Sequence, residues 1–251
     1  MKVGLVGFGR TGKAVASVIL ENTDIQLEWV VRKSQRLEHR SVPEFLGVES
    51  SEPGLIYSSR EFSADDLIDN FPVDAIIDFS SESGLNYYGE AAARRGISIV
   101  SAISQVSDEY RQLLLTLSKT TRVLWSPNIT VGVNFLMIAA KVLKTIAPGT
   151  DIEIIEEHFR DKAEVSGTAI RIAHELNLEK EAIRSIRAGG IIGTHEILFG
   201  FPFQTVRLKH ESISRDAFGM GAVFALEHLQ HESTGLYRME DLMKKYFENA
   251  H

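Results

Sequence analysis

The feature that constrains the fold most is a glycine-rich turn near the start of the chain. Residues 2–8 are mostly apolar and predict a buried strand, and they run directly into Gly7-Phe8-Gly9-Arg10-Thr11-Gly12. A GxGxxG pattern between a strand and a helix is typical of dinucleotide binding, because its glycines permit a tight turn, close approach of a pyrophosphate and packing of the helix on the strand. We therefore expect a dinucleotide at residues 7–12. The alternative is a glycine-rich turn without a ligand.

Basic residues follow the second predicted strand, which runs from Leu27 to Val31. An enzyme selective for NAD usually has Asp or Glu at this place for the ribose hydroxyls, whereas this chain has Arg32-Lys33-Ser34. Cationic side chains suit the 2′-phosphate of NADPH. We expect NADPH as the cofactor, with NADH as the alternative, although a solvated basic turn would give the same pattern.

Strands and helices alternate through the first half of the chain. Buried-strand patterns at 74–80, 97–101 and 123–125 alternate with helical spacing, and Ser63 with Asp66 predicts the capped start of a short helix. This alternation predicts an α/β fold with a Rossmann-like, doubly wound parallel sheet, whose ligands bind at the carboxyl ends of the strands. Four further cofactor contacts are expected at such strand ends: Phe79, Ser80, Ser101 and Ser104.

The pattern changes after a hinge-like connection at 126–134. Strands are predicted near 184–188, 191–199 and 204–210 with little helix between them, which indicates an α+β domain with a mixed or antiparallel sheet. Gly189-Gly190 is a candidate two-residue hairpin turn. Such an open sheet needs its face covered, and oligomerisation is one way to cover it.

The segment 156–168 combines a histidine, two cations and a helix start. The alternation through Ile152, Ile154 and Glu156 ends a strand at His158, and Ser166 looks like the N-cap of the next helix. Free backbone N–H groups at Gly167 and Thr168, with Arg160 and Lys162 nearby, suit a carboxylate. The alternative is an ordinary Ser-capped helix after a charged surface loop. A histidine at a strand end is also more often a polar boundary residue than a catalyst, and the same holds for His195 and His210.

Composition excludes several classes of function. The chain has no cysteine, which excludes disulfides and zinc–thiolate sites and agrees with a reducing cytosol. A net charge of -7 argues against nucleic acid as a partner. The start MKVGLVGFG is interrupted by glycine too early for a signal or membrane span. We expect a cytoplasmic protein with a small-molecule substrate and without a metal site or membrane partner.

Five segments, in the same order along the chain, resemble the dihydrodipicolinate reductase family. They are GFGRTG at 7–12, IIDFS at 76–80, SPNITVGVN at 126–134, EIIEEHFRDKAEVSGTA at 153–169 and SRDAFGMGAVFAL at 214–226. The resemblance implies NAD(P)H-dependent reduction of 4-hydroxy-tetrahydrodipicolinate, a cyclic dicarboxylate of lysine and diaminopimelate biosynthesis. It also implies a dinucleotide-binding domain of residues 1–127 and 216–251, and a domain of residues 128–215 that binds substrate and builds a homotetramer.

By the same resemblance, His158 matches the catalytic histidine of the family and Lys162 matches the proton donor. Ser166, Gly167 and Thr168 match its carboxylate-binding turn, and Arg160 a basic position in the same motif. Asn128, in the 126–134 segment, is a further expected cofactor contact.

The chain departs from the family pattern in three places. Ala163-Glu164-Val165 replaces a slightly longer run, Phe159 stands where many members have a second histidine, and Ser101-Ala102-Ile103 replaces Gly-Thr-Thr. The changes at Phe159 and at 101–104 motivate a second reading as a related NADP-dependent amino-acid dehydrogenase, of the 2,4-diaminopentanoate type. A third reading is a reductase-like protein that binds NADPH without catalysis.

Overall fold

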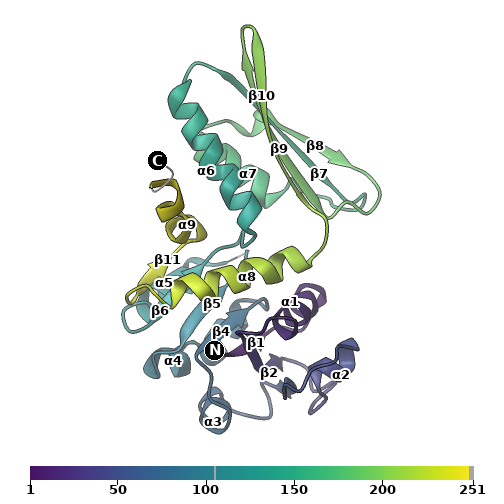
Figure 1. Cartoon of the computed structure of the whole chain (residues 1–251), viewed down its shortest axis with the longest axis vertical. Coiled ribbons are helices and arrows are strands. Elements are labelled where there is room, and N and C mark those ends of the chain that lie inside the picture. The colour runs from purple at the N-terminus through teal and green to yellow at the C-terminus, as the bar shows by residue number, and fades with distance from the viewer. Residues whose placement is uncertain (105, 249–251) are drawn as a thin grey trace. The chain divides into compact units, whose positions relative to one another are not determined.

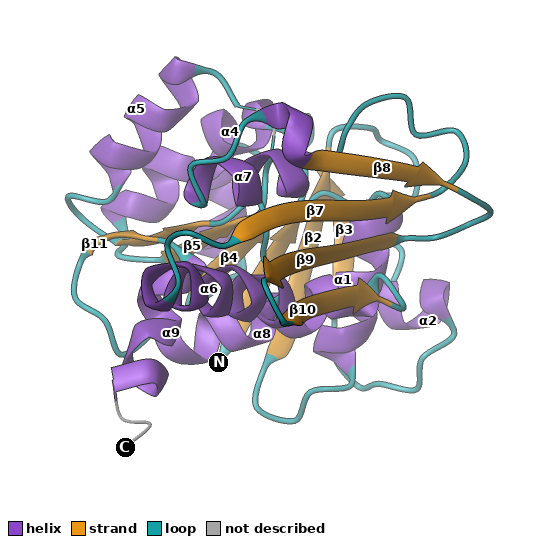
Figure 2. Cartoon of the chain, turned by 90° about the horizontal axis from the view of Figure 1, so that it is seen from above, coloured by secondary structure: helices purple, strands orange, loops and turns teal. Residues whose placement is uncertain are grey.

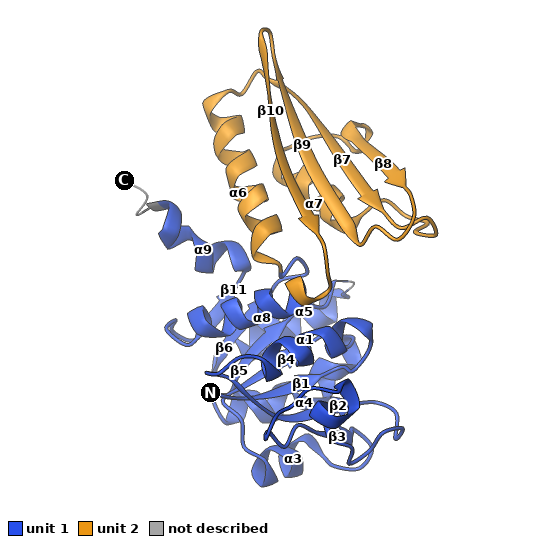
Figure 3. Cartoon of the chain, turned by 45° about the vertical axis from the view of Figure 1, so that its right-hand side comes forward, with its two compact units in different colours: residues 1–129, 218–251 blue, residues 130–217 orange. Residues whose placement is uncertain are grey.

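The chain divides into two compact units in its computed structural model, which describes residues 1–104 and 106–248. Unit 1 consists of Met1–Ile129 and Phe218–His251, and unit 2 of Thr130–Ala217 (Figure 3). The chain passes from unit 1 to unit 2 at 129/130 and returns at 217/218. Each of these positions lies two residues beyond the domain boundary expected at 127/128 or 215/216. The last three residues of the expected 216–251 segment lie outside the described residues.

Unit 1 contains a seven-stranded sheet whose strand pairs are all parallel, in the order β11-β6-β5-β4-β1-β2-β3. Its strands are β1 (Lys2–Val6), β2 (Gln26–Arg32), β3 (Leu55–Ser58), β4 (Ala75–Asp78), β5 (Ser98–Ser101), β6 (Arg122–Trp125) and β11 (Gly235–Tyr237). The order reverses between β1 and β4, because the chain first builds outward through β2 and β3 and then returns to the other side of β1. In a parallel sheet, that reversal leaves a crevice at the carboxyl ends of the two strands.

Helices lie on both faces of this sheet (Figure 1). The helices of unit 1 are α1 (Arg10–Leu20), α2 (Val42–Leu46), α3 (Ala64–Asn70), α4 (Glu82–Arg94), α5 (Asp108–Leu117), α8 (Asp216–Leu229) and α9 (Met239–Glu248). Side chains of α3, α4 and α5 share one apolar core with the sheet. On the other face, α1 and α8 pack so closely that a Cβ at Gly219 would lie 2.7 Å from Cβ of Val18. The expected doubly wound fold is confirmed.

Unit 2 pairs two helices with a mixed four-stranded sheet. It consists of α6 (Val131–Ile146), β7 (Asp151–His158), α7 (Gly167–Glu175), a 3₁₀ turn at Lys180–Ala182, β8 (Ile183–Arg187), β9 (Gly193–Phe201) and β10 (Gln204–Ser212). The strand order is β10-β9-β7-β8, with β7 and β8 parallel and the other pairs antiparallel. α6 and α7 lie on one face of this sheet (Figure 2) and enclose an apolar core that includes Ile154, Ile197 and Phe199.

The expectation of a hairpin at Gly189-Gly190 is wrong. β8 and β9 are not neighbours in the sheet, because β7 lies between them and pairs with both. Residues 188–189 bond instead to the chain that leaves β7: N–H of Ala188 donates to the His158 carbonyl (3.0 Å), and N–H of Arg160 donates to the Gly189 carbonyl (3.1 Å). The hairpin of this unit joins β9 and β10, where Phe201 pairs with Gln204 across a two-residue turn.

Within the described residues, no helix combines the length and apolar character that crossing a lipid bilayer requires.

Candidate active site

The glycine-rich turn lies at the crevice between β1 and β4. Gly7 has φ +99°, and a Cβ there would lie 2.8 Å from the backbone of Phe79 and Ser80, which follow β4. A Cβ at Gly12 would lie 2.1 Å from the Gly7 carbonyl oxygen. Both positions therefore require glycine. Gly9, the N-cap residue of α1, supplies no side-chain hydrogen bond, which leaves the first N–H groups of the helix for an anion.

Two pockets of unit 1 meet at the turn after β4. One, of about 390 Å³, is lined by Gly7, Phe8 and Gly9 on one side and by Arg32 and Lys33 on the other. The second, of about 410 Å³, is lined by residues that include Thr11, Phe79, Ile103, Ser104 and Phe218. Ser80 and Ser81 line both pockets. This arrangement fits an extended dinucleotide, with the basic side chains of Arg32 and Lys33 at one end and Phe79, Ile103 and Phe218 at the other.

Four of the expected cofactor residues do not line these two pockets. Gly12 packs beneath the turn, and Arg10 is exposed as the first residue of α1. Ser101 has no exposed surface, and its hydroxyl bonds to the Tyr110 hydroxyl at 2.6 Å. The carbonyl oxygen of Asn128 accepts a hydrogen bond from the Ser126 hydroxyl at 2.9 Å.

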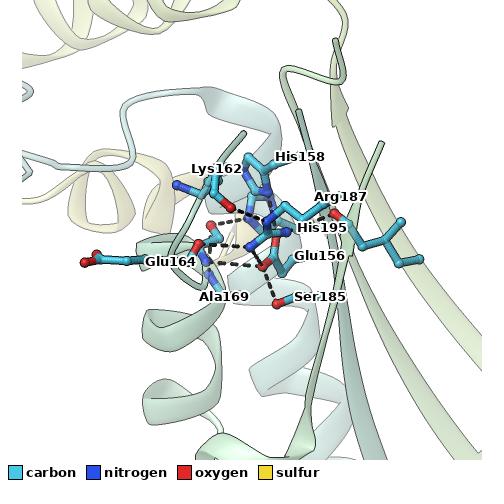
Figure 4. A network of polar contacts seen from close by, with 10 residues as sticks. Glu156, His158, Lys162, Glu164, Ala169, Ser185, Arg187 and His195 are labelled. Carbon is cyan, nitrogen blue, oxygen red and sulfur yellow. Dashed lines mark hydrogen bonds and ion pairs between the residues drawn. The ribbon is translucent and has the colours of Figure 1, made fainter. Parts of the chain in front are cut away.

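The candidate site of unit 2 is centred on the carboxylate of Glu156, whose side chain has no exposed surface (Figure 4). Side chains of a strand alternate between faces, so Glu156 and His158 share one face of β7. The pairing with neighbouring strands adds Ser185 and Arg187 from β8 and His195 from β9 to the same face. These polar groups occupy the end of a face whose other end is the apolar core under α6 and α7.

Both oxygens of Glu156 accept several hydrogen bonds. Oε1 accepts from Arg187 Nη2 (2.7 Å), from the Ser185 hydroxyl (2.5 Å) and from the backbone N–H of Ser166 (3.3 Å). Oε2 accepts from Arg187 Nη1 (3.0 Å) and bonds to Nδ1 of His158 (2.5 Å). Burial raises the pKa of this carboxyl, but these hydrogen bonds outweigh it and hold the pKa at about 2. Glu156 is therefore ionised at neutral pH.

The negative charge of Glu156 determines which ring nitrogen of His158 carries the proton. An ionised carboxylate has no proton to donate, so the hydrogen of their bond belongs to Nδ1, and Nε2 is the nitrogen left for chemistry. Burial lowers the pKa of His158, and the charges of Lys162 and Arg187 act in the same direction, while Glu156 opposes them. At neutral pH the ring is thus mainly neutral, with an acceptor at Nε2.

Ser166 begins α7 and joins the same network. Its hydroxyl accepts from the backbone N–H of Ala169 (3.5 Å) and bonds to Nε2 of His195 (2.8 Å). Burial lowers the pKa of His195 to about 3, so this ring is neutral at physiological pH. Gly167 and Thr168 form the first turn of α7, whose N-terminus favours an anion.

The two expected cations of this segment are placed differently. Lys162 is partly exposed, and its carbonyl oxygen accepts from Nε of Arg187 at 2.9 Å. Arg160 is exposed and is held through its backbone N–H. The structure therefore places Lys162 in the short connection between His158, at the end of β7, and Ser166–Thr168, at the start of α7, and leaves Arg160 exposed.

Four members of the network were not expected as functional residues: Glu156, Ser185, Arg187 and His195. Glu156 could have been predicted from the sequence, because it continues the buried alternation of Ile152 and Ile154, and a buried carboxylate needs a cation. Its partner Arg187 is brought beside it by the parallel pairing of β7 and β8, which no local sequence pattern predicts. In residues 1–104 and 106–248, no group of three or more His, Asp or Glu side chains is arranged to hold a metal ion.

Comparison with known families finds two matches that together span residues 1–243. The model for "Dihydrodipicolinate reductase, N-terminus" matches residues 1–129, and the model for "Dihydrodipicolinate reductase, C-terminus" matches residues 129–243.

Individual proteins give the same result. The 4-hydroxy-tetrahydrodipicolinate reductase of Caldanaerobacter subterraneus subsp. tengcongensis is 33% identical over 194 residues, covering 68% of this chain and 77% of that protein. The enzyme of the same name from Rickettsia bellii is 35% identical over 189 residues, covering 68% of this chain and 76% of that protein. The solved structure of dipicolinate-bound dihydrodipicolinate reductase from Paenisporosarcina sp. TG-14 superposes with a TM-score of 0.78 at 22% identity, over 96% of this chain and 98% of that one. At that identity, the structural likeness concerns the fold.

Proposed function

The chain belongs to the dihydrodipicolinate reductase family, and from this we propose that it reduces 4-hydroxy-tetrahydrodipicolinate to tetrahydrodipicolinate with a hydride from a pyridine nucleotide, while the 4-hydroxyl group leaves as water. The observation that carries the proposal is the match of both family models, which together cover residues 1–243 and so include the whole of unit 2 and most of unit 1. The nucleotide supplies the hydride when bound, and Gly7 to Gly12 would hold its pyrophosphate.

The residues of unit 2 have distinct proposed roles. The first turn of α7, Ser166 to Thr168, would hold a substrate carboxylate through backbone N–H groups and the Ser166 hydroxyl. Lys162 would donate the proton that accompanies the hydride, and its positive charge would offset negative charge that develops on the ring. His158 would accept or return a proton at Nε2, because Glu156 holds the proton on Nδ1.

The test of this function is oxidation of NADPH by the purified protein. Pyruvate and aspartate semialdehyde are condensed in situ by the preceding synthase, and the decrease in NADPH absorbance is followed. We expect oxidation only when the synthase and both of its substrates are present. Oxidation no faster than the background rate would contradict the proposal.

A second candidate function is oxidation of an amino acid of the 2,4-diaminopentanoate type. The observation that favours it is Phe159, an apolar side chain that is 41% exposed directly beside His158, where a polar substrate contact would be expected for a dicarboxylate. Reduction of NADP⁺ that depends on 2,4-diaminopentanoate would support it. Tight NADPH binding with turnover of neither substrate would favour the non-catalytic reading.

NADPH rather than NADH is the proposed cofactor. Arg32 and Lys33 line the pocket of the glycine-rich turn, and Arg32 is oriented by a hydrogen bond from Nη1 to the Arg36 carbonyl (3.1 Å). Their charges would pair with a 2′-phosphate. We expect Arg32→Ala and Lys33→Ala to raise KM for NADPH and to leave KM for NADH nearly unchanged. Arg40→Ala is the control, because Arg40 is exposed and pairs with Glu44. Equal effects on both cofactors would contradict the assignment.

We also propose a homotetramer in the cytoplasm. The face of the unit 2 sheet opposite α6 and α7 carries two ion pairs, Arg184 with Glu153 and Arg207 with Glu196, and the 44% exposed side chain of Ile186. Burial between copies would cover this face. Light scattering should give four times the chain mass, and Ile186→Glu should lower it. A monomer at all concentrations would contradict the proposal.

A further inference from the structure

Arg187 occupies the point where β8 meets the connection between β7 and α7. It is the last residue of β8, and the parallel register places it opposite His158, with Ser185 opposite Glu156. Its side chain is 20% exposed. Arg184 lies on the same strand but on the other face, is 61% exposed and pairs with Glu153.

The guanidinium of Arg187 has no N–H group left over. Nε donates to the Lys162 carbonyl (2.9 Å). Nη1 donates to Oε2 of Glu156 (3.0 Å) and to the Ile186 carbonyl (2.9 Å). Nη2 donates to Oε1 of Glu156 (2.7 Å) and to the Glu164 carbonyl (2.9 Å). An arginine side chain has five N–H donors, and here each one has a protein acceptor. No donor is left for a substrate.

These hydrogen bonds hold the connection between β7 and α7, which contains Lys162, the proposed proton donor. Residues 162 and 164 are held by Arg187, residue 166 is held by Glu156, and residue 160 is held by the Gly189 carbonyl. Arg187 and Glu156 are themselves joined by two hydrogen bonds, and Glu156 holds Nδ1 of His158. One guanidinium thus links the backbone of Lys162 to the carboxylate that orients His158.

We propose that Arg187 is a positioning residue, whose planar set of donors fixes Lys162 and His158 relative to each other without contacting substrate. The inference rests on the proposed function for the roles of Lys162 and His158. A lysine at this position would keep the positive charge but has three donors on one nitrogen, so it cannot reach acceptors on Glu156 and on two backbone carbonyls at once.

The experiment separates charge from geometry with two variants. Arg187→Lys keeps the charge and loses the planar donors, and Arg187→Met loses both. We expect both to lower kcat by about tenfold or more, since displacement of a reacting group by ~1 Å lowers rates by roughly 10²-fold. KM for NADPH should stay within about twofold, because Arg187 has no free donor for a ligand. Arg184→Lys should leave kcat unchanged.

The second readout needs no substrate. In an NMR titration of the His158 ring, Arg187→Met should raise the pKa, because the positive charge of Arg187 opposes protonation of His158. Arg187→Lys should leave that pKa close to the original value, and Arg184→Met is the control. This titration tests the link from Arg187 to His158 even when 4-hydroxy-tetrahydrodipicolinate is not the substrate.

Three results would overturn the inference. The first is full kcat in Arg187→Lys with unfolding temperature and circular dichroism unchanged, since the planar donors would then be dispensable. The second is an increase in KM for the dicarboxylate at constant kcat, which would make Arg187 a ligand. The third is an unchanged His158 titration in Arg187→Met. If Arg187→Met does not fold, Arg187→Lys decides the question through kcat.

Discussion

Glu156 and Asp78 are both carboxylates without exposed surface, yet their surroundings shift their pKa values in opposite directions. Glu156 has an arginine beside it and stays charged, with a pKa of about 2. Among the described residues, Asp78, at the end of β4, accepts hydrogen bonds from neutral groups alone: the Ser80 backbone N–H (2.8 Å), the Ser80 hydroxyl (2.6 Å) and the Tyr88 hydroxyl (3.0 Å). Burial raises its pKa to about 6 despite these hydrogen bonds.

Stability should therefore depend on pH through Asp78. Its pKa is higher in the folded chain (about 6) than in the unfolded one (3.8), so its contribution is fully present below pH 3.8 and is lost as pH rises through 6. The loss amounts to about 3 kcal/mol, from roughly two pKa units. Asp78→Asn should remove this component. Urea unfolding at pH 4, 5, 6 and 7 gives the free energy of unfolding at each pH. The same pH dependence of this free energy in Asp78→Asn and in the parent would contradict the prediction. Glu156, with its lowered pKa, loses its contribution only below pH 4.5.

Removal of the His158 ring should affect catalysis more than binding. His158→Ala should lower kcat by about 10²–10⁴-fold, the usual contribution of a general acid or base. The dissociation constant of NADPH, measured by fluorescence, should not change, because the glycine-rich turn belongs to the other unit. His174→Ala, on the exposed side of α7, is the matched control. Equal kcat values for His158→Ala and the parent would show that a different group moves the proton.

Single residues differed in how well the sequence predicted them. His158 and Ser166 could be placed because a strand end and a helix start are local patterns. Ser101 was expected to face the cofactor, but its hydroxyl is used by Tyr110 from α5, a contact between distant segments. His195 was read as a boundary residue, and its contact with Ser166 likewise depends on how β9 pairs with β7.

At the scale of elements, two helices with similar N-caps should respond differently to the same substitution. Ser166 caps α7 and Ser63 caps α3, each by accepting a backbone N–H three residues on. Replacement of either serine by alanine should lower the free energy of unfolding by about 1 kcal/mol. Only Ser166→Ala should also raise KM for the dicarboxylate, since only α7 begins at the proposed carboxylate site. Denaturant unfolding and steady-state kinetics measure the two effects, and a KM increase in Ser63→Ala would contradict this assignment.

Most strands and helices could be predicted because their patterns are local. The capped start at Ser63, the alternation of β7 and the buried-strand pattern of β5 all lie within a few residues. The order of the unit 2 strands could not be predicted, because Gly189-Gly190 looks like a hairpin turn whether or not its strands pair. β11, with three residues, is too short to show a pattern and is defined by its pairing with β6.

At the scale of the whole chain, the last helix should matter to the first unit. Met239, Leu242 and Met243 of α9 are almost fully buried, although they lie near the end of the chain. Leu242→Ala should lower the free energy of unfolding by about 2–5 kcal/mol, the usual effect of emptying a core position. Leu115→Ala, at a 45% exposed position on α5, should change it by no more than about 0.5 kcal/mol. Similar decreases in the free energy of unfolding of the two variants would mean that α9 adds little to the stability of the core.

The discontinuity of unit 1 has a consequence for biosynthesis. β6 ends at Trp125, and its outer neighbour β11 begins only at Gly235, after the whole of unit 2. At ribosomal rates of about 5–20 residues per second, the delay is on the order of ten seconds. During this interval the whole of unit 2 is synthesised, while β6 presents an unpaired edge of N–H and C=O groups. Chaperone demand and co-translational aggregation of this protein should therefore be concentrated at that edge.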